Sequence, residues 1–136
     1  MNVILRNISA PILGWILGSV VNMGIIMLSP LVLTYPEGFD NSTMERLAET
    51  IHLLSTGLLL MPFFAHALGA LFGAFVAAKT AASHQMKFAL GVGAFFLIGG
   101  ILMVNMVPSP TWFNALDLIV AYIPMAFIGG KLAGAK

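Results

Sequence analysis

The chain has no cysteine and very little charge. Six Lys and Arg and five Asp and Glu make up 8% of its 136 residues, whereas charged residues are about 25% of a soluble domain. The absence of cysteine excludes disulfides, thiolate metal sites and thiol catalysis. The few basic residues form no patch that would meet the phosphates of a nucleic acid, so we expect no nucleic-acid partner.

Hydrophobic residues are abundant instead, at 60% of the chain, with a mean hydropathy of +1.00. They form four apolar stretches, at residues 11–33, 51–78, 88–107 and 113–130. Each stretch comes close to or exceeds the length of about 20 helical residues that crosses a hydrocarbon core. The sequence therefore predicts an all-α, polytopic membrane protein, a bundle of four transmembrane helices that forms one domain over residues 1–136 and contacts the lipid bilayer.

Basic residues are distributed unevenly between the two ends of such a bundle. Five of the six lie on the side of the two termini: Arg6, Lys79, Lys87, Lys131 and Lys136. The opposite side has only Arg46, among four acidic residues. The positive-inside rule then predicts that both termini are cytoplasmic. We expect an integral protein of the bacterial inner membrane.

The connection before the second stretch carries a helix signal, and two of the stretches contain proline. Ser42 and Glu45 have the spacing of a capping box, so we expect a helix to begin near Ser42 and to continue into the second stretch. Pro62 and Pro124 predict kinks in the second and fourth helices. Discontinuous helices form the binding sites of many transporters, whereas kinks that only improve packing are the simpler interpretation.

Small residues recur at four-residue spacing, which lets two helix backbones approach closely in lipid. The helix-packing candidates are the glycines of these rows: Gly14, Gly18, Gly69, Gly73 and Gly130. One interpretation is a face for a homo-oligomer or for other membrane helices. The other interpretation is packing within the four-helix bundle, and the sequence leaves both open.

Polar side chains at membrane depth are the candidates for function, because their burial in lipid is costly. Six residues form this set: Asn22, His66, Asn105, Asn114, Asp117 and Tyr122. Asp117 is the only acid inside an apolar stretch, and His66 lies near the middle of the second helix. If these side chains share one interior, they form a polar path for protons or a small solute.

Several of these residues also have a purely structural interpretation. Asn22 and His66 could hydrogen-bond each other and hold two helices together, a contact that contributes roughly 0.6 kcal/mol in membranes. Asn114 and Asp117 could simply begin the fourth helix at its positive dipole end. The predicted ranges put His66 and Asp117 at depths that differ by more than one turn, which argues against an acid–base pair between them.

Two arrangements of histidine would suit a metal or a haem. Glu49 and His52, with Glu45 one turn earlier, resemble half of a carboxylate-bridged di-iron site. His52 and His66 fall on nearly one face of a helix, a spacing similar to that of membrane cytochromes b. Both arrangements need a second set of ligands from a partner chain. A solvated turn is the simpler interpretation of the first group, so we expect no metal and no cofactor.

Four segments carry a resemblance to a known group of proteins. They are Gly18-Ser19-Val20-Val21-Asn22-Met23, Ala65-His66-Ala67-Leu68-Gly69, Leu116-Asp117-Leu118 and Ala121-Tyr122-Ile123-Pro124. In these segments the chain resembles small, uncharacterised bacterial four-helix membrane proteins. The resemblance implies no activity and no functional residue.

The function predicted from the sequence is transport. The chain has no G-x-S-x-G elbow and no phosphate-binding loop, so nothing in it indicates an enzyme. We favour an oligomeric transport or conducting protein with a polar interior for protons or a small solute. The alternative is a non-catalytic accessory or assembly subunit that docks other membrane helices. A membrane haem protein or enzyme is the third hypothesis.

Overall fold

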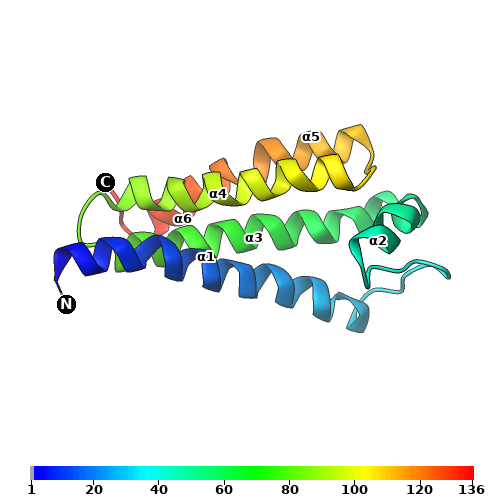
Figure 1. Cartoon of the computed structure of the whole chain (residues 1–136), viewed down its shortest axis with the longest axis horizontal. Helices are drawn as coiled ribbons and strands as arrows, with labels where there is room; N and C mark the ends of the chain where they lie inside the picture. The colour runs from blue at the N-terminus through cyan, green and yellow to red at the C-terminus, as the bar shows by residue number, and fades with distance from the viewer. Residues whose placement is uncertain (1) are drawn as a thin grey trace.

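The computed structural model describes residues 2–136. Four helical segments within it are long and apolar enough to cross a membrane: Val3–Leu31, Thr56–Thr80, Gln85–Met106 and Thr111–Leu132. They pack side by side as a bundle, with both chain ends at one end and the short helix α2 (Met44–Thr50) at the other (Figure 1). The chain is therefore an all-α integral membrane protein with four candidate spans.

The first helix, α1 (Val3–Leu28), begins eight residues before the predicted range of 11–33. The Asn2 side chain caps it by accepting a hydrogen bond from the helix. Arg6 then holds the added turns in place, because its Nε donates to the Thr80 carbonyl oxygen at 2.9 Å. Polar contacts outside the apolar stretch therefore extend the helix.

The connection after α1 forms helices of its own. Thr43 caps α2, because its Oγ1 accepts a hydrogen bond from the Arg46 amide at 3.1 Å. The 3-10 turn η2 (Ile51–Leu53) follows α2. The prediction that a helix begins near Ser42 is confirmed, but the prediction that it continues into the second membrane helix is wrong.

The second membrane helix, α3 (Thr56–Thr80), begins five residues after the predicted start of the range 51–78. Ser55 caps it, since its Oγ accepts a hydrogen bond from the Leu58 amide at 3.4 Å. Pro62 lies inside α3 without interrupting it. The membrane span is thus shorter at the α2 end than the hydropathy alone indicates.

The fourth predicted helix, at residues 113–130, consists of two helices. They are α5 (Thr111–Val120) and α6 (Ile123–Leu132). Pro124 explains the break, because it has no N–H to donate and its ring clashes with the Val120 carbonyl in a continuous helix. The sequence predicted a kink here, and the structure has a discontinuous helix.

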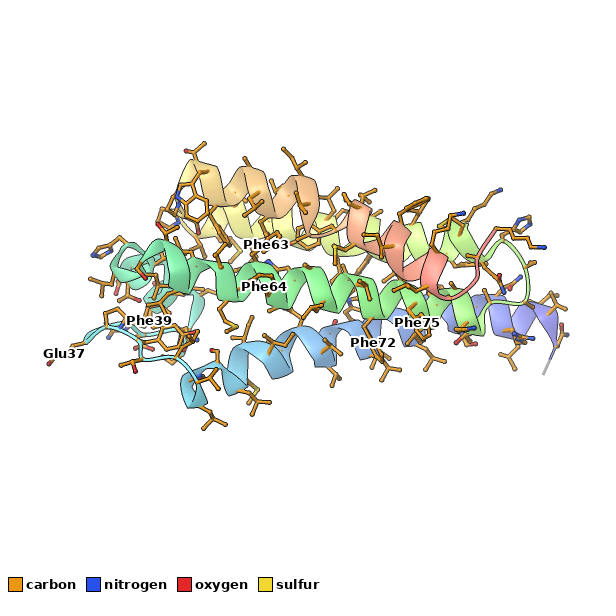
Figure 2. All side chains as sticks on the ribbon, turned by 180° about the vertical axis from the view of Figure 1, so that it is seen from behind. Glu37, Phe39, Phe63, Phe64, Phe72 and Phe75 are labelled. Atoms are coloured by element: carbon orange, nitrogen blue, oxygen red, sulfur yellow. The ribbon has the colours of Figure 1, made fainter. Side chains whose placement is uncertain are left out.

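Small side chains fill the core. α3 lies at the centre and contacts α1, α4 (Gln85–Met106, predicted at 88–107), α5 and α6. Its buried positions are almost all Ala or Gly, and Val92 of α4 is the largest side chain that is completely buried. Large apolar side chains are buried at the α2 end, where Ile51, Leu59 and Phe113 form a core cluster. Many others are exposed, among them Phe64 and Phe72 of α3, at 51% and 40% (Figure 2). Such a surface suits contact with lipid.

The predicted glycines lie in helix contacts within the chain. A Cβ at Gly14 would lie 2.5 Å from the Gly73 carbonyl oxygen, and a Cβ at Gly73 would lie 2.6 Å from that of Gly14. Gly18 and Gly69 make the same reciprocal contact, at 2.6 and 2.9 Å. Gly130 packs against side chains of α4. Close contact between backbones thus joins the helices, which is the usual role of small residues in membrane helices. These glycines therefore take part in packing within the bundle.

Candidate functional site

Three polar side chains meet inside the bundle, and we call them the His–Asp–Tyr cluster. Nδ1 of His66, on α3, lies 2.8 Å from Oδ1 of Asp117, on α5. Tyr122, between α5 and α6, donates its hydroxyl to Oδ2 of Asp117 at 2.8 Å. The Tyr122 hydroxyl oxygen also lies 3.2 Å from Nδ1 of His66. Asp117 is only 4% exposed, so these contacts satisfy a carboxylate that is almost completely enclosed.

The hydrogen bonds leave one basic nitrogen of the cluster unpaired. An ionised Asp117 only accepts hydrogen bonds, so Nδ1 of His66 and the hydroxyl of Tyr122 both act as donors to it. Nε2 of His66 then carries a lone pair. Among residues 2–136, Nε2 has no hydrogen-bond partner, and this atom is not fully buried. The His66 and Tyr122 rings stack with their centroids 5.8 Å apart, which fixes the orientation of the imidazole.

The helix starts explain why the ring and the carboxylate lie at the same level. The sequence ranges argued against a pair between His66 and Asp117, and this prediction is wrong. α3 begins at Thr56 rather than at residue 51, so His66 lies closer to the α2 end than predicted. α5 begins at Thr111 rather than at 113, so Asp117 lies deeper. Both differences reduce the predicted separation.

The break between α5 and α6 brings Tyr122 to the carboxylate. In a continuous helix, residues five positions apart point in different directions, since each residue turns by about 100°. Tyr122 has φ −110° and ψ −77°, away from the helical values of about −63° and −42°. This distortion lets its hydroxyl reach back to Asp117. Helical periodicity alone does not predict that these two side chains meet.

A cavity of about 130 Å³ leads from the α2 end of the bundle to the cluster. His66, Asp117 and Gly100 line its inner end. Tyr35 and Ser29 line the outer part, where their hydroxyls lie 2.8 Å apart. Most of the wall is apolar and includes Leu47, Ile51, Leu59, Met103, Val107 and Phe113. Phe39, on the connection between α1 and α2 (Figure 2), also lines the cavity.

The polar interior does not continue to the other end of the bundle. Between Tyr122 and the end of the bundle that holds the chain ends, the core consists of small apolar side chains: Ala74, Ala78, Ala89, Ala126, Ala133 and Ala135. Apart from Tyr122, the only enclosed polar or charged residues in the described part of the chain are Ser29 and Asp117. The bundle thus holds a one-ended cavity with the His–Asp–Tyr cluster at its closed end.

Asn22 does not join the cluster. It packs on Gly69 at the contact of α1 with α3, and its Oδ1 is buried without a hydrogen-bond partner in the structure. The hydrogen bond predicted between Asn22 and His66 is therefore wrong. His66 is oriented by α5 and Tyr122 instead.

The other two predicted asparagines lie apart from each other. Asn105 is exposed, and its Nδ2 donates to the Ile101 carbonyl oxygen of its own helix at 2.8 Å. Asn114 lines the cavity, and its Nδ2 donates to the Ser109 carbonyl oxygen at 3.2 Å. Of the two, only Asn114 belongs to the site.

The residues considered for a metal do not converge. Glu49 pairs with Arg46 at 3.5 Å, and both side chains are 62% exposed. In the part of the chain that the structure describes, no three His, Asp or Glu side chains, Glu45 included, form a group that could hold a metal. His52 is exposed and does not line the cavity, so it shares no site with His66.

Gly100 belongs to the site and was not predicted. A Cβ at this position would lie 2.6 Å from the Tyr122 hydroxyl oxygen, so the glycine makes room for the cluster. Its neighbour Gly99 has nothing within 4 Å of the same position. The sequence shows two adjacent glycines in an apolar helix, but only the tertiary packing distinguishes them.

Comparison with known proteins finds no matching family model, no matching curated protein and no matching solved structure. The features of the molecule that bear on its function are therefore the His–Asp–Tyr cluster and the cavity beside it.

Proposed function

We propose that this chain is a small membrane transport protein that binds a small solute in the cavity and exchanges a proton at His66. One observation supports the proposal above all: the His–Asp–Tyr cluster lies at the inner end of a cavity that extends to the α2 end of the bundle. Ionisable groups inside membrane spans are costly and mark the pathways of ions and substrates. Asp117 would stabilise the imidazolium that forms when Nε2 takes up a proton.

The one-ended cavity favours a carrier over an open channel. A carrier exposes its site to one side of the membrane at a time, and its helices are often discontinuous at that site. Here the break between α5 and α6 lies next to the cluster. In this mechanism the alanine-rich contacts of α6 with α3 and α4 would separate when the cavity opens to the other side.

The charge distribution favours one orientation. Arg6 and four lysines belong to the end of the bundle that holds the chain ends. By the positive-inside rule that end would be cytoplasmic. The cavity would then open to the opposite side of the inner membrane.

The alternative of an accessory subunit depended on free glycine faces. The predicted glycines pack inside the bundle, so they offer no free face for docking to other membrane helices. Formation of a homo-oligomer stays a prediction.

Proteoliposomes loaded with the pH-sensitive dye pyranine test the proposal. With equal pH on both sides, methylguanidinium, erythritol or methanesulfonate is added outside. These solutes are a cation, a neutral molecule and an anion, and none of them crosses lipid as a neutral acid or base. We expect at least one to change the internal pH faster than in protein-free liposomes.

Two variants make the assay specific. His66→Gln should abolish the pH change, because glutamine cannot carry the proton. His52→Gln alters an exposed histidine outside the cavity and should leave the pH change intact. A folded wild-type protein that gives no pH change with any of the three solutes would exclude proton-linked transport.

A further inference from the structure

The cavity lining carries one negative charge and no positive one. Asp117 is its only acid, and neither Lys nor Arg lines it. The titratable groups that face His66 are Asp117 and Tyr122, and Tyr35 lies in the outer part of the cavity. Helices α1 and α4 contribute no titratable side chain to the lining. The cavity is therefore anionic while His66 is neutral, and it has no net charge once His66 is protonated.

The polar contact that this cavity offers at its closed end is a hydrogen-bond acceptor. Both oxygens of Asp117 are already engaged by the cluster. Nε2 of His66 is the unpaired acceptor beside them. A ligand that donates an N–H to Nε2 therefore complements the closed end in hydrogen bonding, and a positive charge on that ligand complements Asp117.

The volume and the walls limit the size and polarity of the ligand. The cavity measures about 130 Å³, whereas sites for drug-sized ligands measure about 300–1,000 Å³. An engineered apolar cavity of about 150 Å³ binds benzene. Leu59, Met103 and Phe113 are among the apolar lining residues, so a hydrated metal ion would find few ligands there. The cavity therefore fits a ligand with a short apolar part and one polar group.

We propose that the ligand of the cavity is a small monovalent organic cation, which donates an N–H to Nε2 of His66 and packs its apolar part against the walls. This inference depends on the proposed function, since it names the substrate class of the same site. A proton competes with the cation. Protonation of Nε2 removes the acceptor and neutralises the charge of the cavity, so one cation leaves as one proton binds, and the exchange is electroneutral.

Binding to the purified full-length chain in detergent micelles tests the inference directly. Methylguanidinium serves as the cation, because a guanidinium stays charged up to a pH of about 12. Any pH dependence of its affinity therefore reports protonation of the protein. N-methylurea has the same shape without the charge. Isothermal titration calorimetry measures the affinity of the wild-type protein and of each variant. NMR of ¹⁵N-histidine-labelled wild-type protein shows whether the ligand contacts the ring nitrogens of His66.

The expected result has three parts. Methylguanidinium binds at least tenfold more tightly than N-methylurea. Its affinity falls as the pH is lowered, by up to about tenfold per pH unit, because a proton on Nε2 excludes the cation. n-Butylguanidinium binds more tightly than methylguanidinium, by about fourfold for each added CH₂ that the walls bury.

Variants separate a binding role from a structural one. His66→Gln keeps a carbonyl acceptor but does not titrate, so binding should persist with an affinity that no longer varies with pH. Asp117→Asn should remove the preference for the cation over N-methylurea. If Asp117→Asn does not fold, the pH profile of the wild-type protein still decides the question.

The outcomes distinguish this inference from the proposed function. Equal affinity for methylguanidinium and N-methylurea, or an affinity for the cation that does not change with pH, would overturn the inference. If erythritol or methanesulfonate drives proton exchange in liposomes and methylguanidinium does not, transport stands and the substrate class is wrong. If methylguanidinium binds as expected but no solute moves protons, the ligand class stands and the transport function fails.

Discussion

Replacement of Gly100 by alanine tests whether the His–Asp–Tyr cluster is held in one geometry by the packing around it. A Cβ at this position would lie 2.6 Å from the Tyr122 hydroxyl oxygen and 2.7 Å from two atoms of its ring. Carbon atoms in favourable contact are about 3.5–4.0 Å apart, so the ring would have to move by about 1 Å. Tyr122 is only 3% exposed, and its hydroxyl bonds Asp117, so the side chain has little freedom to move.

Two destabilising effects and one smaller stabilising effect determine how Gly100→Ala changes the free energy of unfolding. Overpacking of a filled core costs about 1–3 kcal/mol. Loss of the hydrogen bond from Tyr122 to Asp117 leaves enclosed polar groups unpaired, which costs about 1–3 kcal/mol more. Because Gly100 lies inside α4, its replacement by alanine also gains about 1 kcal/mol in helix propensity. We therefore expect Gly100→Ala to lower the free energy of unfolding by about 1–5 kcal/mol.

The adjacent glycine provides the matched control. Gly99→Ala adds its methyl group to open space, and alanine is a better helix former than glycine by about 1 kcal/mol. Unfolding of both variants in mixed micelles can be followed by the fluorescence of Trp15 and Trp112. Equal free energies of unfolding for the two variants would refute the tight contact between α4 and Tyr122.

Three further predictions concern other contacts. Gly18→Ala should destabilise the bundle, because its Cβ would lie 2.6 Å from a backbone carbonyl oxygen of α3. Gly24→Ala, on the same helix, adds its methyl group to open space and serves as the control. A lower thermal unfolding temperature for Gly24→Ala than for Gly18→Ala would contradict the close contact. Tyr122→Phe removes only the hydroxyl and should lower the free energy of unfolding by about 1–3 kcal/mol, and an unchanged value would mean that its carboxylate partner is satisfied elsewhere. Hydrogen bonds from Ser42 lower the pKa of Asp40 below its ordinary value of 3.8, so this carboxylate favours the folded connection above that pH and ceases to do so as the pH falls through its lowered pKa. NMR titration of the Asp40 carboxyl carbon should give a midpoint below 3.8 that rises in Ser42→Ala, and a midpoint at or above 3.8 would contradict the contact.

Local sequence properties were enough to predict the four membrane segments. Hydropathy and segment length are properties of continuous stretches, so each predicted range overlaps a helix of the structure. The boundaries were less accurate, because they depend on single polar side chains. Asn2 and Arg6 extend α1 beyond its apolar stretch, while Ser55 begins α3 inside the predicted one.

The functional residues were only partly predictable for a related reason. The rarity of polar groups in apolar stretches identified His66, Asp117 and Tyr122 as candidates. The same criterion also selected Asn22 and Asn105, which do not reach the cluster. Polarity indicates that a side chain needs a partner, but it does not indicate which partner it finds.

A helical membrane protein with few ionisable groups in its spans follows from the order of the amino acids alone. These properties follow from the cost of placing charge and unpaired backbone in hydrocarbon, which every segment meets independently. The packing of distant segments brings a histidine, an acid and a tyrosine into one site, and it is this packing that makes Gly100 rather than Gly99 leave room for them. The relative depth and rotation of helices depend on caps, on the break at Pro124 and on backbone contacts between distant glycines, and those are properties of pairs of segments.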